Sequence, residues 1–117
     1  MSQINTTGCK GFAAGAARAA HLRVYLSSGA LATAGATQAM IGTQDQASFA
    51  ATDRVNVRLK SAQGTMKCVA SEGITGGALV YAAASGKVAS SGTVVEGVAM
   101  ETVTADGDII EVMPTDA

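Results

Sequence analysis

The chain has 117 residues, including 24 alanines and 14 glycines, but no tryptophan, two phenylalanines and two tyrosines. This composition excludes a large aromatic core, and the length fits one compact domain. A net charge of −1 gives no sign of a nucleic-acid partner. Residues 1–60 carry six basic and two acidic side chains (+4), whereas residues 61–117 carry two basic and seven acidic ones (−5). This division favours head-to-tail contact between copies or a basic front end on an acidic partner, unless it arises by chance.

The first twenty residues show no strand pattern. They are polar before Phe12, and the alanine-rich residues 13–20 could be helical, although Gly11 and Gly15 weaken a helix. Because this segment has little of its own to bury, we expect residues 1–20 to form an extended arm and residues 21–117 to form a single β domain. The segment is a poor secretory signal, and no stretch of the sequence passes as a membrane span.

Alternation of apolar and polar residues predicts the first long strands. Over residues 21–26 the inward positions are Leu22, Val24 and Leu26, and Ser27-Ser28-Gly29 supplies a turn. The clearest alternation covers residues 54–60. Its apolar face holds Val55, Val57 and Leu59, and its polar face holds Arg54, Asn56, Arg58 and Lys60. Both segments are typical of half-buried strands.

Shorter strands are expected between turn signals that recur about every ten residues. They cover residues 65–70, 78–82, 87–89, 94–103 and 108–113, with a turn at Asp106-Gly107. Residues 45–51 could form one or two helical turns. We expect at least one of Gly76, Gly77 and Gly97 to have a conformation or a close contact that excludes a Cβ. The chain is therefore predicted to be mainly β, as a small β-barrel or β-sandwich.

Patterns typical of catalysis or metal binding are missing from the sequence. His21 is the only histidine and lies within a strand pattern, and Cys9, His21 and Cys68 lack ligand spacing. The cysteines could pair once, but free thiols are expected in a reducing compartment. No G-x-S-x-G motif marks a nucleophile, and Gly86-Lys87 lacks the rest of a phosphate-binding loop. We predict that the chain is not an enzyme and uses no metal or other cofactor.

Several short motifs run in order through residues 12–113. They are Ala14-Gly15, Arg23-Val24-Tyr25-Leu26, Ile41-Gly42, Val55-Asn56-Val57-Arg58-Leu59, Ile74-Thr75-Gly76-Gly77-Ala78-Leu79-Val80-Tyr81, Gly86-Lys87-Val88, Glu96-Gly97-Val98-Ala99, Ala105-Asp106-Gly107-Asp108 and Ile110-Glu111-Val112. In this order they resemble the capsid cement, or head decoration, proteins of tailed bacteriophages. Arg18 departs from the resemblance, because an aliphatic residue is expected at its position.

The resemblance implies a trimer on the outer surface of an icosahedral phage head. Such a protein bridges major capsid subunits and stabilises the shell without catalysis. It is a virion component made in the host cytoplasm, and neither nucleic acid nor membrane is a direct partner. The basic arm is expected to contact the capsid through Lys10, Phe12 and Arg18. The expected trimer or capsid interface residues are Arg23, Tyr25, Arg54 and Arg58.

Two other readings of the sequence remain open. One is a different phage structural module, such as a tail-tube, spike-base or shell subunit. The other is a β-barrel that binds a small molecule or catalyses a reaction.

Overall fold

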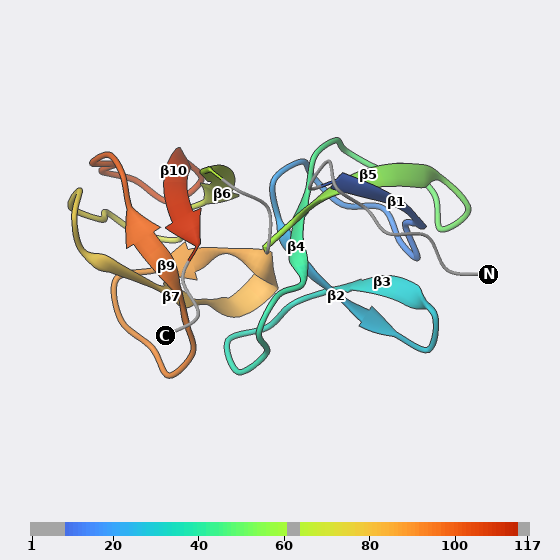
Figure 1. The fold of residues 1–117 in the computed structure, drawn as a ribbon, viewed down its shortest axis with the longest axis horizontal. Coiled ribbons are helices and arrows are strands. Elements are labelled where there is room, and N and C mark those ends of the chain that lie inside the picture. Colours follow the sequence, from blue (N-terminus) through green and yellow to red (C-terminus); the bar gives the residue numbers. More distant parts are fainter. Residues whose placement is uncertain (1–8, 61–63, 115–117) are drawn as a thin grey trace.

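The computed structural model describes residues 9–60 and 64–114, and of residues 9 and 10 it describes the backbone alone. Within this part the chain is mainly β, as predicted, and two curled antiparallel sheets of five strands each contain all its strands. The one helical element described is the 3-10 turn η1 (Ala84–Gly86). Figure 1 shows the sheets side by side, and we call them the N-terminal lobe and the C-terminal lobe.

The N-terminal lobe has the strand order β1-β5-β4-β2-β3. Its strands are β1 (Cys9–Ala13), β2 (Arg23–Ser27), β3 (Ala30–Thr33), β4 (Gly42–Gln44) and β5 (Arg54–Leu59). The predicted turn between β2 and β3 is confirmed. Ser28 and Gly29 both have positive φ, at 53° and 84°, as a two-residue hairpin turn requires.

The alternation in β5 is confirmed, because Val55 and Val57 are buried while Arg54 and Asn56 are exposed. In β2 the prediction holds only in part. Val24 is buried in the core of the lobe, but Leu26, near the end of the hairpin, is 45% exposed. The core of this lobe is small. Its buried members are Ala14, Val24, Leu31, Val55 and Val57.

The structure corrects the expectation of an arm over residues 1–20. Residues 9–13 form β1, which pairs with β5 from Cys9↔Arg58 to Ala13↔Arg54. Ala14 is fully buried, and its N–H donates to the carbonyl of Asp53 at 2.8 Å. Residues 13–20 are not helical either. From residue 9 onward the segment is thus part of the lobe, and residues 1–8 lie outside the described residues.

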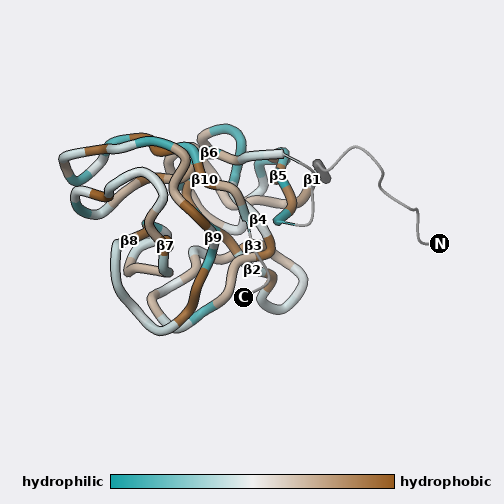
Figure 2. Tube along the Cα trace, turned by 60° about the vertical axis from the view of Figure 1, so that its left-hand side comes forward, coloured by the Kyte–Doolittle hydropathy of each residue, from teal (hydrophilic) through white to brown (hydrophobic). Residues whose placement is uncertain are grey.

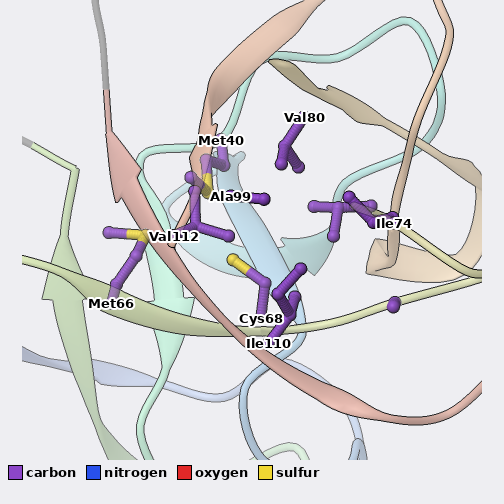
Figure 3. Close-up of a cluster of buried hydrophobic side chains, with 10 residues drawn as sticks. Met40, Met66, Cys68, Ile74, Val80, Ala99, Ile110 and Val112 are labelled. Atoms are coloured by element: carbon purple, nitrogen blue, oxygen red, sulfur yellow. The ribbon is translucent and has the colours of Figure 1, made fainter. Parts of the chain in front are cut away.

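The C-terminal lobe has the strand order β6-β10-β9-β7-β8. Its strands are β6 (Met66–Val69), β7 (Leu79–Ala82), β8 (Val88–Ala89), β9 (Val95–Ala99) and β10 (Ile109–Pro114). Ten buried side chains form its core, twice the number in the other lobe (Figure 3). One of them, Met40, comes from the β3–β4 connection, so the N-terminal half contributes to this core.

Gly97 confirms the prediction of a position that excludes a Cβ. It pairs with Val80 on one side and Pro114 on the other, inside the sheet. A Cβ built on Gly97 would lie 2.4 Å from the carbonyl oxygen of Met113. The turn at Asp106-Gly107 is also confirmed, since Gly107 has a φ of 92°.

The lobes meet along backbone as well as side chains. Gly86, in η1, donates its N–H to the carbonyl of Ala34 at 2.9 Å. In the view of Figure 2, hydrophobic (brown) and hydrophilic (teal) stretches alternate along the chain in both lobes, and neither lobe is uniformly apolar. We call the contact between the two lobes, which includes this hydrogen bond from Gly86 to Ala34, the seam.

Candidate interaction surfaces

Arg23 is fully buried at the seam, although the sequence placed it on an interaction surface. Its side chain donates to five carbonyl oxygens and one carboxylate. The acceptors are Ala34, Gly35, Gln38, Ala83, Lys87 and Glu96. The last three belong to the C-terminal lobe, so Arg23 ties the lobes together. The prediction of an interface role is wrong for this side chain, because it does not reach the surface.

Glu96 is the acidic partner of Arg23 and is also fully buried. Its Oε2 lies 2.9 Å from Nη1 of Arg23 and accepts the N–H of Met40 at 3.2 Å, while its Oε1 lies 3.0 Å from Nζ of Lys60. Burial lowers the pKa of Arg23, and the charge of Glu96 opposes this, so the guanidinium keeps its proton at neutral pH. Two basic residues of the first half, Arg23 and Lys60, therefore pair with an acidic residue of the second half, Glu96, within one molecule.

Arg18 is buried within the N-terminal lobe. Its Nη1 donates to the carbonyl of Ala14 at 2.7 Å and to Oε1 of Gln44 at 2.9 Å, and its Nε donates to Oγ1 of Thr33 at 3.1 Å. Burial lowers the pKa of the guanidinium. These hydrogen bonds explain how an arginine fills a position where an aliphatic residue was expected. They also correct the expected capsid contact, because the charged group faces inward.

The other predicted interface residues lie in different places. Phe12 packs partly buried against the core of the N-terminal lobe, and Tyr25 is half-buried on β2. Arg54 is exposed at the start of β5, and Arg58 is half-buried near its end. The backbone of Lys10 lies in β1, but its side chain lies outside the described residues. Arg54 and Arg58 thus remain candidates for contact with a partner.

A groove of about 520 Å³ is lined by Arg58 and by residues of β6 and β10. Its charged and titratable lining residues are His21, Asp45, Arg58, Lys67, Glu101 and Glu111. The groove is lined by similar numbers of basic and acidic groups, so its charge does not favour a strongly charged ligand. Among residues 9–60 and 64–114, no cluster of three or more His, Cys, Asp or Glu side chains could hold a metal ion. The same residues contain no helix long and apolar enough to cross a membrane.

Phe49 stands out on the surface, because 85% of it is exposed. It lies in the connection from β4 to β5, where residues 45–51, which could have formed helical turns, have bends and turns. The Oδ2 of Asp53 accepts the N–H groups of Phe49 at 2.8 Å and of Ala50 at 3.1 Å. Next to it, Ser48 and Arg18 exchange two backbone hydrogen bonds of 2.9 and 3.1 Å. The loop is thus held in one conformation around an unpacked aromatic ring.

A second apolar surface covers the outer side of the C-terminal sheet. Leu79 pairs with Val98, and Val98 pairs with Met113, so the three side chains form a row across β7, β9 and β10. Leu79 and Met113 are 44% and 42% exposed, and Met100, two residues after Val98, is 49% exposed. We call these four residues the apolar face. A contiguous row of this kind, unlike scattered apolar residues, is typical of an interaction site.

Sequence reasoning overlooked both of these surfaces. The alternation in residues 108–113 places Met113 and Val112 on different faces of the strand. This pattern alone could have identified Met113 as one exposed member of the apolar face. No local pattern marked Phe49, since an isolated aromatic between two strands fits an ordinary loop.

Cys68 carries a free, buried thiol. Burial raises its pKa to about 12, so it is protonated and unreactive at neutral pH. This agrees with the expectation of free thiols for Cys68, whereas the side chain of Cys9 lies outside the described residues.

Comparison with known proteins shows a likeness of fold. No protein family model matches the sequence, and no curated protein matches it. Among solved structures, the crystal structure of the N base of the head fiber gp8.5 of bacteriophage phi29 is similar, with a TM-score of 0.77. The similarity covers 92% of this chain and 92% of that chain, at 14% sequence identity. The described chain therefore shares its fold with the base of a bacteriophage head fiber.

Proposed function

We propose that this protein is a structural component of a bacteriophage head. It binds the outside of the icosahedral shell as a homotrimer, contacts the major capsid protein and stabilises the shell, and it has no catalytic role. The observation that carries this proposal is the shared fold with the phi29 head fiber base over 92% of both chains. The order of sequence motifs that resembles the capsid cement proteins supports it independently.

The surface of the molecule fits a role based on contact area. Phe49 and the apolar face offer exposed aromatic and sulfur-containing side chains, which are enriched in protein interfaces. The loop around Phe49 is already ordered by Asp53, so its conformational entropy is not lost again on binding. The groove, in contrast, offers no arrangement of groups that resembles a catalytic site.

Binding to undecorated heads tests the proposal. Purified protein is added to heads that lack it, and occupancy is measured by particle reconstruction together with the temperature at which the shells open. We expect density at threefold or quasi-threefold positions on the outside and a higher opening temperature. Heads that bind nothing, or that bind it only inside the shell, would contradict the proposal.

The part of the expected arm that precedes β1 is tested in the same assay. Deleting residues 2–8 leaves β1 intact, so the truncated protein should fold. If this segment attaches the protein to the shell, occupancy falls sharply. Full occupancy would assign the contact to the surfaces of the two lobes.

A fiber or spike base is the second candidate function, and it is favoured because the similar phi29 structure is the base of a head fiber. A base carries a longer projection, whereas a cement protein forms a compact cap. Reconstructions of virions separate the two, because only a base has density that continues away from the shell above each trimer.

A further inference from the structure

The chain has a single Asp-Gly pair, Asp106-Gly107, and no Asn-Gly pair. An aspartate before glycine is especially prone to spontaneous isomerisation in a flexible chain, because glycine has no side chain to hinder its backbone nitrogen. The other aspartates of the described residues precede Gln46, Arg54 and Ile109, whose side chains hinder the same reaction. The turn at residues 106 and 107 is therefore where the backbone is chemically most vulnerable.

Isomerisation of this pair needs no enzyme, oxidant or reductant. The backbone nitrogen of Gly107 attacks Cγ of Asp106, and the N–H proton leaves with the carboxyl hydroxyl as water, so that a succinimide ring forms. Water then opens the ring. Opening at Cγ restores aspartate, whereas opening at the backbone carbonyl gives isoaspartate, in which the main chain runs through Cγ. The product has the same atoms as the starting chain but one more atom in its backbone.

The fold holds the attacking nitrogen. The N–H of Gly107 donates to the carbonyl of Ala70 at 2.8 Å, and Ala70 is fully buried in the core of the C-terminal lobe. The N–H of Ala70 in turn donates to the carbonyl of Asp108 at 2.8 Å, so two hydrogen bonds fix the turn to this core. A base in solution cannot take the Gly107 proton while it points at a buried carbonyl. The turn therefore has to move away from Ala70 before the reaction begins.

Two carboxylates restrain the turn around the reacting group. Oδ1 of Asp106 lies 2.8 Å from Nζ of Lys87, although 64% of the Asp106 side chain is exposed. Oδ2 of Asp108 accepts the N–H groups of Thr104 at 3.3 Å and of Ala105 at 3.1 Å. An exposed ion pair is a weak restraint, whereas a carboxylate that accepts two backbone N–H groups fixes the chain itself. Asp108 is thus the side chain that holds the turn closed.

We propose that Asp106-Gly107 is a site of spontaneous covalent modification, which the native fold keeps unreacted and which opening of the C-terminal lobe exposes. Isoaspartate lengthens the backbone between two residues, Gly107 and Asp108, that both bond to Ala70. A chain that has isomerised therefore cannot restore both bonds with the native geometry. The chemistry depends on this turn alone and not on binding to a phage head, so it stands or falls independently of the proposed function.

The rate of isoaspartate formation at residue 106 tests the proposal. The full-length protein is kept at neutral pH, and isoaspartate is measured by peptide mapping with mass spectrometry. A peptide of residues 102–110 serves as the unfolded reference. Because the turn has to open first, we expect the native protein to react at least about tenfold more slowly than the peptide. In urea the two rates should become equal. Equal rates without urea would overturn the proposal.

Two variants at one position show whether the turn itself provides the protection. Asp108→Ala removes the acceptor of the two N–H groups, whereas Asp108→Asn keeps a carbonyl oxygen there. Each rate is divided by that of a peptide with the same change, which removes local sequence effects. We expect several times less protection in Asp108→Ala than in Asp108→Asn, and circular dichroism confirms that both are folded. Equal protection in the two variants would overturn the role of the turn.

Hydrogen exchange of the wild-type protein gives a measurement that needs no variant. The amide of Gly107 should exchange with deuterium far more slowly than in the peptide, since its proton is held by the carbonyl of Ala70. An amide that exchanges at the rate of the peptide would contradict the proposed protection, even if isoaspartate forms slowly.

Discussion

The two lobes reach a similar fold with different interiors. The C-terminal lobe encloses ten buried apolar residues, including Met66, Cys68 and Ile110. The N-terminal lobe buries five, and around them lie two buried arginines, Arg18 and Arg23, whose donors are satisfied mainly by backbone carbonyls. Apolar contact is the main source of order in the C-terminal lobe, whereas fully paired polar groups supplement a lean core in the N-terminal lobe. A sheet with few buried aliphatic side chains can thus be stabilised by buried, fully hydrogen-bonded guanidinium groups.

Removing the arginine at the seam should have the largest effect on stability. Arg23→Met leaves Glu96 buried with Lys60 as its only charged partner and leaves five carbonyl oxygens without this donor. We expect the free energy of unfolding to fall by about 3–5 kcal/mol, measured by urea denaturation. Arg54→Met, at an exposed arginine, is the matched control and should change it by less than about 0.5 kcal/mol. Equal effects of the two variants would show that the seam does not depend on Arg23.

Truncating the C-terminal core should have the next largest effect. Ile110 is fully buried in β10, while its neighbour Ile109 is 44% exposed. Ile110→Ala should destabilise the protein by about 3 kcal/mol, because it removes buried surface and leaves a cavity. Ile109→Ala, the same change one residue earlier, should have much less effect in the same denaturation assay. If the two are indistinguishable, the apolar core does not dominate this lobe.

A smaller effect is expected from a side chain at Gly97. Gly97→Val forces β9 away from the carbonyl of Met113 and should destabilise the protein by more than about 1 kcal/mol. Gly11→Val, in β1 of the other lobe, is the matched control, because a Cβ there meets nothing closer than 3.8 Å. The thermal midpoints of both variants measure the difference. An unchanged midpoint for Gly97→Val would mean that the sheet adjusts around the added side chain.

The last prediction concerns Cys68, whose contribution to stability is constant at neutral pH and changes only in alkaline solution. Its thiol has an ordinary pKa of 9.0 when unfolded and about 12 when folded. The unfolded protein therefore loses this proton first, so the stability that the buried thiol contributes is complete below pH 9 and declines as the pH rises toward 12. In a Cys9→Ser background, iodoacetamide at pH 8 should modify Cys68 only after urea is added. Rapid modification of the native protein would show that the C-terminal core opens readily.

The strands were predictable where one face is apolar and the other polar, as in β5, and where a turn is encoded locally, as at Ser28-Gly29. The strand β1 was not predictable, because its pairing with β5 joins residues that are 41 (Ala13 and Arg54) to 49 (Cys9 and Arg58) positions apart, and Gly11 interrupts its side-chain pattern. The candidate interaction surfaces were likewise predictable only as far as local sequence patterns determine them. Alternation places Arg54 on a polar face, but it does not reveal whether another part of the chain covers that face.

Arg23 shows this limit most clearly. Its side chain lies on the other face of β2 from that of Val24, as a solvent-facing arginine would. This face becomes interior because the β3–β4 connection and the second lobe cover it. An arginine on the surface and one that binds six acceptors look alike in a sequence. The difference depends on residues 83–96, which are far from β2 along the chain.

The cradle around Arg23 also bears on the order in which the chain can fold during synthesis. Ala34, Gly35 and Gln38 leave the ribosome soon after Arg23, but Ala83, Lys87 and Glu96 follow up to 73 positions later. Until then the guanidinium has half of its acceptors, and the first sheet has a side that is not yet covered. Contacts this distant slow folding, because a long loop must close before they form. The N-terminal half of a growing chain is therefore committed to its final structure only when β9 has been made.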